Sequence, residues 1–332
     1  MMIAVFGAGA IGCWIGGKLA ASGADVTLIG RPRMCDELAH GVTVTDLDGG
    51  SARSVPGLAT TPDAAASASL VLVTVKSAQT EAAGKALAPA LAKGAVVVSF
   101  QNGVRNADVL RTAIPARRVL AAMVPFNVTR RDAGGKVIYH RATAGILRVD
   151  DDPANAELLA ACRAAALPIE PRRDMPAVQW AKLVMNLNNA INALSGIPLA
   201  TELAQREFRR CLAAAQREAL DLLAADHQTV AKLTAIPPRW MPRLLEAPDA
   251  LFLVLARRIV AIDPHARSSM WDDLEAKRPT EIDYLQGEVV ALAERLGTDA
   301  PINRALVRLV RAAEAGGARD FTASALRTAL GL

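Results

Sequence analysis

The first half of the chain alternates short apolar runs with stretches of helical periodicity. Apolar, β-branched runs of four to six residues, spaced by helices, predict strands that are buried on both faces of a parallel sheet with βαβ crossovers. The expected strands are residues 3–6, 26–29, 70–75 and 96–100, and the runs at 119–126, 137–139 and 144–149 predict strands added at the far end of that sheet. The pattern therefore predicts an N-terminal α/β domain.

The pattern changes after Pro168. Pro168, Pro171 and Pro176 predict a linker or domain junction, and beyond them strand patterns give way to long helical periods. The expected helices are residues 178–194, 202–225, 251–262, 281–296 and 302–315. Because 332 residues exceed what one core usually holds, we expect two domains, residues 1–171 and an all-α part, residues 172–332.

Composition excludes several classes of protein. A chain that is 52% hydrophobic and 21% charged is neither disordered nor collagen-like. The net charge of +5 is scattered and aromatic residues make up 4%, which argues against a nucleic-acid partner. No apolar run is long enough for a membrane span, and the first residues lack the basic region of a signal peptide. The four cysteines lie far apart, so we expect reduced thiols, no metal site and a cytoplasmic location.

A glycine-rich motif follows the first expected strand and opens a helix. Residues 7–12 read Gly7, Ala8, Gly9, Ala10, Ile11 and Gly12, which is G-x-G-x-x-G. The first glycine permits a tight turn, the second lets backbone approach a pyrophosphate, and the third lets helix and strand pack closely. The helix N-terminus then faces the phosphates with its partial positive charge. The motif predicts a Rossmann-type dinucleotide-binding domain; the alternative is a set of glycines that serve the turn alone.

Three polar residues stand at the ends of other expected strands. Arg31 follows the second strand, nineteen residues after Gly12, where NAD enzymes tend to have an acidic residue that binds the ribose. An arginine there can bind a 2′-phosphate, so NADP(H) is the expected cofactor, and a solvated surface arginine is the alternative. Lys76 and Asn102 follow the third and fourth strands, at the sheet edge where ligands of open α/β sheets bind. Asn102-Gly103 can equally mark a simple turn.

The first expected helix after the prolines carries Lys182, Asn186 and Asn189 in an otherwise apolar sequence. At about 100° per residue these side chains share one face about 60° wide. A cation beside amides suits a small substrate with a carbonyl and a carboxylate; a polar contact between helices explains the pattern as well. Further on, Thr280 after Pro279 predicts a helix cap, with Glu281 in the first turn.

These motifs together resemble the ketopantoate reductase (2-dehydropantoate 2-reductase) family. The resemblance runs from Gly7 to Tyr284 through T-V-K, Q-N-G, W-x-K-L-x-x-N, and S-S-M followed by R-P-T-E-I-D-Y. It implies that Gly7 to Gly12, Arg31, Lys76 and Asn102 contact NADPH. It also implies that Lys182 is the catalytic lysine, that Asn186 binds substrate, and that Ser269 and Glu281 complete the site.

The resemblance implies NADPH-dependent reduction of ketopantoate to pantoate, a step of pantothenate and coenzyme A biosynthesis. Two departures bear on the substrate. Position 190, where the family has a second asparagine, is Ala. Asn189 lies on the same helix face as Lys182, whereas Asn192 better matches the family's sequence around this position, and the helix geometry favours Asn189. Residues 121–127 lack the threonines usual in the family. The alternatives are a reductase of another branched 2-oxo acid and a dinucleotide sensor without turnover. A homodimer stays open.

Overall fold

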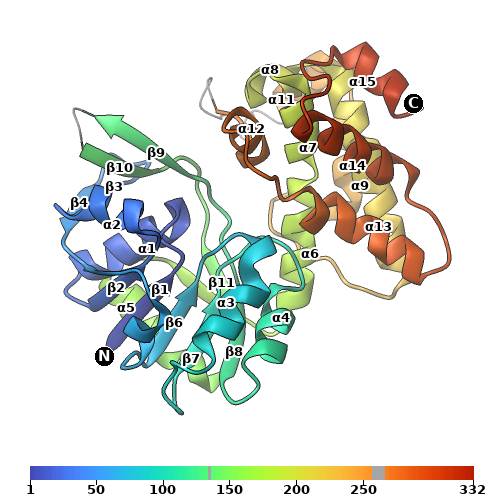
Figure 1. The fold of residues 1–332 in the computed structure, drawn as a ribbon. Helices are drawn as coiled ribbons and strands as arrows, with labels where there is room; N and C mark the ends of the chain where they lie inside the picture. The colour runs from blue at the N-terminus through green and yellow to red at the C-terminus, as the bar shows by residue number, and fades with distance from the viewer. Residues whose placement is uncertain (134–135, 256–265) are drawn as a thin grey trace. The chain divides into compact units, whose positions relative to one another are not determined.

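The structure is a computed structural model that describes residues 1–133, 136–255 and 266–332. The chain divides into two compact units, Met1–Met175 and Pro176–Leu332 (Figure 1). Strands occur in the first unit, and the described part of the second unit is helical. The predicted fold class, an α/β Rossmann-type domain followed by an all-α domain, is confirmed.

The main sheet of the first unit has the strand order of a dinucleotide-binding domain. Its strands, in spatial order, are β12 (Ile169–Arg172), β11 (Leu147–Asp150), β8 (Arg118–Met123), β7 (Val96–Ser99), β6 (Leu70–Val73), β1 (Met2–Phe6), β2 (Asp25–Ile29) and β5 (Gly57–Ala59). From β8 to β5 all neighbours are parallel, whereas β11 runs antiparallel to β8. From β1 the chain builds outward to β2 and β5, then returns to β6 on the other side of β1. This reversal of strand order is where such sheets bind ligands.

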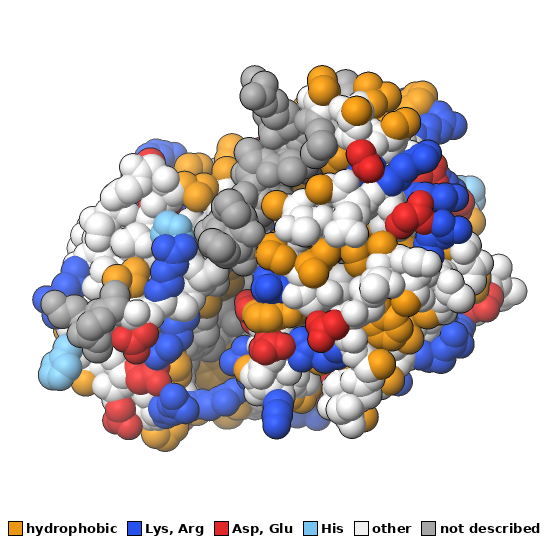
Figure 2. All heavy atoms as spheres, turned by 90° about the horizontal axis from the view of Figure 1, so that it is seen from above, with side chains coloured by type: hydrophobic (Ala, Val, Ile, Leu, Met, Phe, Trp, Pro, Cys, Tyr) orange, Lys and Arg blue, Asp and Glu red, His pale blue; other side chains and the backbone are white. Residues whose placement is uncertain are grey.

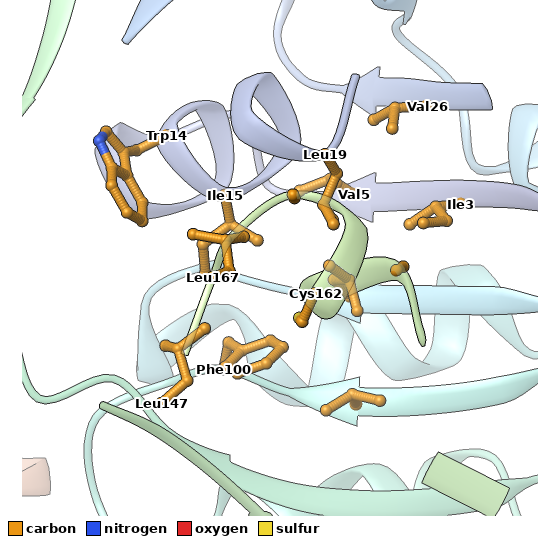
Figure 3. Close-up of a cluster of buried hydrophobic side chains, with 14 of the residues drawn as sticks. Ile3, Val5, Trp14, Ile15, Leu19, Val26, Phe100, Leu147, Cys162 and Leu167 are labelled. Carbon is orange, nitrogen blue, oxygen red and sulfur yellow. The ribbon is translucent and has the colours of Figure 1, made fainter. Parts of the chain in front are cut away.

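Helices pack on this sheet and bury its apolar strands. They are α1 (Ala10–Ala21), α2 (Pro32–Leu38), α3 (Thr80–Leu87), α4 (Asn106–Ala113) and α5 (Ala156–Ala164), with short 3-10 turns η1 (Pro62–Ala65), η2 (Ser77–Gln79) and η3 (Pro153–Asn155). Figure 3 shows Ile15 and Leu19 of α1 and Cys162 of α5 directed at the side chains of the strands. α3 packs on α4, and α4 lies against β7 and β8. Burial of these aliphatic side chains stabilises the domain.

A second, four-stranded sheet lies in the same unit, and the sequence did not predict it. Its order is β4 (Ser51–Ser54), β3 (Val42–Thr45), β10 (Lys136–Arg141) and β9 (Val128–Ala133). The prediction that residues 137–139 extend the main sheet is therefore wrong. β10 pairs antiparallel with β9 and parallel with β3, about a hundred positions earlier in the chain. An apolar run predicts a strand but does not select its partner, which depends on contacts distant in sequence.

Helix α1 is covered on two sides, by the main sheet and by the second sheet. A Cβ atom at Gly16 would lie 2.5 Å from Leu28 of β2, and one at Gly17 would lie 2.8 Å from Val44 of β3. The Trp14 indole donates to the Thr45 carbonyl oxygen at 3.1 Å. The two adjacent glycines thus allow close packing on both sides, which fixes the helix that begins at the glycine-rich motif.

The proline-rich segment after residue 168 is in part a strand. β12 contains Pro171 and pairs parallel with β11 at the edge of the main sheet. An edge strand needs hydrogen bonds on one side only, so it tolerates a residue without an N–H. Pro171 therefore lies in an edge strand and not in a linker, while the division between the two compact units falls after Met175, within the segment 168–176.

The second unit contains more and shorter helices than the periodicity predicts. They are α6 (Met175–Asn186), α7 (Asn188–Ser195), α8 (Leu199–Ala204), α9 (Arg206–Ala225), η4 (Pro238–Trp240), α10 (Met241–Leu245), α11 (Asp249–Leu255), α12 (Ser269–Glu275), η5 (Ile282–Tyr284), α13 (Gln286–Arg295), α14 (Pro301–Glu314) and α15 (Ala323–Ala329). The expected helix 178–194 is interrupted at Leu187, whose carbonyl accepts a hydrogen bond from the Gln286 side chain at 2.8 Å. The helix expected at 202–225 starts at Leu199 and is broken at the extended Gln205. Of the helix expected at 251–262, residues 256–262 lie outside the described residues.

No helix within the described ranges is both long enough and apolar enough to cross a membrane. On the face seen in Figure 2, Lys and Arg side chains occupy several separate places, with Asp and Glu among them. The basic side chains therefore do not form one continuous patch on the face shown.

Candidate functional site

The glycine-rich motif forms a tight turn between β1 and α1. Gly7 has a φ of +114°, which a side chain would disfavour, and the N–H groups of Gly7 and Ala8 both donate to the carbonyl oxygen of Ile29 at the end of β2. Helix α1 starts at Ala10 with Gly9 as its N-cap, and no side chain caps it. The first N–H groups of the helix are therefore available to an anion, as phosphate sites at helix N-termini require.

The space around the other two glycines differs sharply. A Cβ atom at Gly12 would lie 2.3 Å from the Gly7 carbonyl oxygen and 2.5 Å from the Thr74 hydroxyl, so close packing requires glycine here. A Cβ atom at Gly9, by contrast, would meet nothing within 4 Å. Gly9 is exposed, so its lack of a side chain keeps space clear outside the turn. These residues fit a bound dinucleotide pyrophosphate.

Arg31 stands beside this turn. A Cβ atom at the preceding Gly30 would lie 2.7 Å from the Ala8 side chain, so the end of β2 and the turn are in close contact. Arg31 is exposed at the N-cap of α2, and within the described ranges its guanidinium has neither a hydrogen-bond nor an ion-pair partner. Arg33 is instead engaged by Glu37, at 3.0 Å. Of these two arginines, Arg31 is the one without an ion-pair partner among the described residues.

A buried polar network holds the chain after β6 and β7, where Lys76 and Asn102 lie. The Gln101 amide donates to the Val75 carbonyl oxygen at 3.0 Å and to the Thr80 hydroxyl at 2.7 Å. The Ser77 hydroxyl donates to the carbonyl oxygen of Asn102 at 3.0 Å. Lys76 is exposed and Asn102 is partly exposed, so the network fixes their backbone and leaves their side chains at the surface.

The structure places Lys182 and Asn186 one turn apart on α6, both partly buried. Desolvation by burial lowers the pKa of Lys182 to about 8. The lysine also takes part in a polar interaction, so burial does not leave it without a partner. A lysine whose pKa lies near neutrality can give up a proton in a reaction, which makes Lys182 the strongest acid–base candidate of the helical unit.

The two asparagines that the sequence left open have different environments. Asn192 is fully buried, and its amide nitrogen donates to the Ile197 carbonyl oxygen at 3.0 Å and to Glu202 at 2.7 Å. Its amide oxygen accepts the backbone N–H of Ser268 at 2.8 Å. Asn189 is partly exposed, so we keep Asn189 as the candidate substrate ligand and assign Asn192 to the packing of α7.

Ser269 and Glu281 stand at the starts of the two later elements. Ser269 is exposed as the first residue of α12, and Ser268 caps that helix by accepting the Trp271 N–H at 3.1 Å. Glu281 is partly buried immediately before η5, and the Thr280 hydroxyl accepts the Ile282 N–H at 3.2 Å. Thr280 is therefore not a helix cap as predicted: its hydroxyl bonds the first residue of η5, but the N-cap of that 3-10 turn is Glu281, and α13 begins only at Gln286.

Several residues that contact the candidate site residues were not identified from the sequence: Thr74, Gln101, Glu202 and Ser268. Thr74 and Gln101 are the first residues of the T-V-K and Q-N-G motifs, so the sequence could have pointed to them. It could not have shown which groups they hydrogen-bond. Glu202 carried no signal, because its burial follows from the folding of α8 against α7.

Metal and thiol chemistry find no support in the described residues. No group of three or more His, Cys, Asp or Glu side chains there could hold a metal ion. The cysteines are free thiols, and burial raises the pKa of Cys13, Cys162 and Cys211 to about 12. At neutral pH these three thiols are protonated and weakly nucleophilic.

Comparison with known proteins shows the family. The pattern described as Ketopantoate reductase PanE/ApbA matches residues 3–151, and that of its C-terminal part matches residues 174–314. A PanE/ApbA family ketopantoate reductase from Ralstonia eutropha JMP134, of known crystal structure, is 32% identical with a TM-score of 0.79, covering 95% of this chain and 99% of that chain. This chain belongs to the ketopantoate reductase family.

Other members and neighbours agree with this placement. A curated 2-dehydropantoate 2-reductase of Halobacterium salinarum is 29% identical over 324 residues, which is 96% of this chain and 100% of that protein. A D-mandelate dehydrogenase, solved with NADH and anilino(oxo)acetate, has a TM-score of 0.76 at 19% identity and covers 95% of this chain and 99% of that chain; this likeness shows the fold alone. As a ketopantoate reductase family member, the chain is an NAD(P)-dependent oxidoreductase with a small-molecule substrate.

Proposed function

We propose that this enzyme reduces 2-dehydropantoate to pantoate with NADPH, the reaction that supplies pantoate for pantothenate and coenzyme A biosynthesis. The observation that carries the proposal is Lys182, a partly buried lysine whose pKa burial lowers to about 8, in a chain whose first unit has the turn of a dinucleotide site. A reductase of a 2-oxo acid needs both a hydride donor and an acid for the growing alkoxide.

The residues of the first unit would hold the cofactor. The N–H groups at the start of α1 face the pyrophosphate, and Gly9 leaves the space that it requires. Arg31 carries a charge for the 2′-phosphate that distinguishes NADPH from NADH. Lys76 and Asn102 contribute from the ends of β6 and β7, held in place by the Gln101 network. When bound, NADPH supplies a hydride to the keto carbon.

The residues of the second unit would act on the substrate. The Lys182 ammonium polarises the keto oxygen and donates the proton that converts the alkoxide to a hydroxyl. Asn186, Asn189 and Ser269 hold polar groups of the substrate, and Glu281 orients Lys182 or binds the substrate hydroxyl. Each of these side chains is at least partly exposed, as contact with a substrate requires.

Initial rates of NADPH oxidation with ketopantoate test the proposal directly. Ketopantoate should give a kcat/KM at least tenfold above that of each other 2-oxo acid in a panel that includes branched and aryl members. A higher kcat/KM for another branched 2-oxo acid would make that acid the substrate instead. The absence of threonines in residues 121–127 favours this alternative. Absence of turnover with the whole panel would favour a dinucleotide sensor. A homodimer, tested by analytical ultracentrifugation, is a further proposal.

A further inference from the structure

A buried carboxylate lies behind the candidate substrate residues of the helical unit. Glu202 of α8 is 1% exposed, and it accepts hydrogen bonds from the Asn192 amide at 2.7 Å and from the Ser195 hydroxyl at 3.4 Å. Burial raises the pKa of Glu202 to about 7. A buried carboxyl is costly unless hydrogen bonds compensate it, and the reaction proposed above makes no use of this one.

The carboxylate determines which way the Asn192 amide points. A carboxylate oxygen only accepts, so it selects the nitrogen end of the amide, and the Ile197 carbonyl oxygen selects the same end. The oxygen end is thereby directed at the backbone N–H of Ser268, 2.8 Å away. The two acceptors therefore fix the orientation of the Asn192 amide, and its oxygen in turn binds the Ser268 N–H.

Ser268 connects this arrangement to the candidate substrate ligands. Its hydroxyl donates to the carbonyl oxygen of Asn189 at 3.1 Å and caps α12 at the Trp271 N–H. Ser269 is the next residue, and Leu199 donates from its N–H to the Ala266 carbonyl oxygen at 2.9 Å, which ties the same segment to the start of α8. The starts of α7, α8 and α12 are thus joined through one chain of hydrogen bonds.

We propose that Glu202 is a positioning residue: through Asn192 it holds Ser268, and so sets Ser269 and Asn189 for the substrate. This inference rests on the proposed function, because it takes Ser269 and Asn189 as substrate ligands. Glu202 itself, buried behind Asn192, does not touch the substrate. Its loss should raise KM for the 2-oxo acid and leave NADPH binding unchanged, because the cofactor residues belong to the other unit.

The helical unit offers a matched control. Asn303 of α14 is also fully buried, and its amide donates to Glu218 at 2.7 Å and to the Ala215 carbonyl oxygen at 3.1 Å. This pair has the same donor and acceptor chemistry around a buried asparagine, although Glu218 is partly exposed, and its hydrogen bonds join α14 to α9. Asn303→Leu should therefore lower the thermal stability without altering KM more than twofold.

The test compares KM, kcat and NADPH affinity in Glu202→Leu, Glu202→Gln and Asn303→Leu. Glu202→Leu should raise KM about tenfold with the dissociation constant of NADPH within twofold of wild type. Glu202→Gln keeps an acceptor oxygen toward the Asn192 amide, the contact on which the proposal depends, so it should restore KM to within about threefold. If Glu202→Leu and Asn303→Leu both lower stability and both leave KM unchanged, Glu202 is a structural residue and the proposal is wrong.

If Glu202→Leu does not fold, Glu202→Asp replaces it in the test. Aspartate keeps the charge but withdraws the carboxylate from Asn192 by one methylene. It should raise KM at least fivefold; an unchanged KM overturns the proposal. If the wild-type enzyme turns over no 2-oxo acid, the proposed function is wrong, but the positioning of Ser268 by Glu202 can still be tested by hydrogen exchange. The Ser268 amide should then exchange faster in Glu202→Asp than in Asn303→Leu, and equal rates would refute it.

Discussion

The Thr74 hydroxyl donates a hydrogen bond to the carbonyl oxygen of Gly7 at 2.7 Å. Thr74 follows β6 and Gly7 follows β1, so this bond joins the two strands between which the order of the sheet reverses. It fixes the glycine turn from the side opposite to β2, whose Ile29 carbonyl oxygen accepts the Gly7 N–H. The turn is thus held in shape before any cofactor binds.

Thr74→Val should loosen this turn because valine keeps the volume but loses the hydroxyl. A lost hydrogen bond of this kind costs about 1 kcal/mol, so we expect NADPH affinity to fall roughly fivefold. Thr74→Ser retains the donor and is the control. Fluorescence titration with NADPH measures both, and equal affinities for the two variants would show that the hydrogen bond is irrelevant to the turn.

Substitution of Gly9 and Gly12 by alanine should separate cofactor binding from folding. At Gly9 a methyl group meets nothing in the protein, so Gly9→Ala should keep the melting temperature within about a degree while it obstructs the pyrophosphate. At Gly12 the methyl group would overlap the Gly7 carbonyl oxygen, and overpacking of this kind costs roughly 1–3 kcal/mol. Thermal unfolding and NADPH titration of both variants check this, and a destabilised Gly9→Ala would contradict it.

Arg31→Ala should weaken NADPH much more than NADH. Only NADPH carries the 2′-phosphate, and a charge-assisted contact is worth about 1.5–3 kcal/mol, or roughly ten- to a hundredfold in affinity. Arg33→Ala is the matched control because Glu37 already pairs with Arg33. Dissociation constants for both cofactors decide the matter: equal weakening of NADPH and NADH by Arg31→Ala would remove it as the discriminating residue.

The reduction should slow as pH rises through about 8, the pKa to which burial lowers Lys182. The proton donor is the ammonium form, so deprotonation removes the acid and kcat should fall tenfold per pH unit above that value. Lys182→Ala should lower kcat about a hundred- to ten-thousandfold, the usual contribution of general acid catalysis, and leave NADPH binding intact. A near-normal kcat in this variant, with a lower melting temperature, would make Lys182 a structural residue.

Glu202 should make the stability of the enzyme depend on pH. Its pKa rises from 4.5 to about 7 on folding, so the folded protein holds this proton more tightly than the unfolded chain. The resulting stabilisation, about 3 kcal/mol, is complete below pH 4.5 and is lost as pH rises through 7. Relative to Glu202→Gln, which cannot titrate, wild type should therefore lose several degrees of melting temperature between pH 5 and pH 8. Parallel pH curves for the two proteins would contradict the raised pKa.

Much of the fold followed from local patterns. Strands β1, β2, β6 and β7 are continuous apolar runs, and the glycine motif between β1 and α1 has a spacing that few other structures require. The second sheet was missed because β4 and β9 are polar, and because the partners of β10 are chosen by distant contacts. Likewise, the break at Leu187 depends on Gln286, which lies ninety-nine residues further along the chain.

The sequence by itself determined the residue types that chemistry requires: the glycines of the turn, Arg31 after β2, and Lys182 with Asn186 on one helix face. These are readable because turns, strand ends and helix faces are set by neighbours within a few positions. Only the tertiary structure decided that Asn192 is buried while Asn189 reaches the surface. It also decided that Glu202 orients the Asn192 amide, whose oxygen accepts the Ser268 N–H. Hydrogen bonds join residues as far apart as Asn192 and Ser268, seventy-six positions, or Leu187 and Gln286, ninety-nine positions, and the order of residues along the chain does not encode which of them will meet.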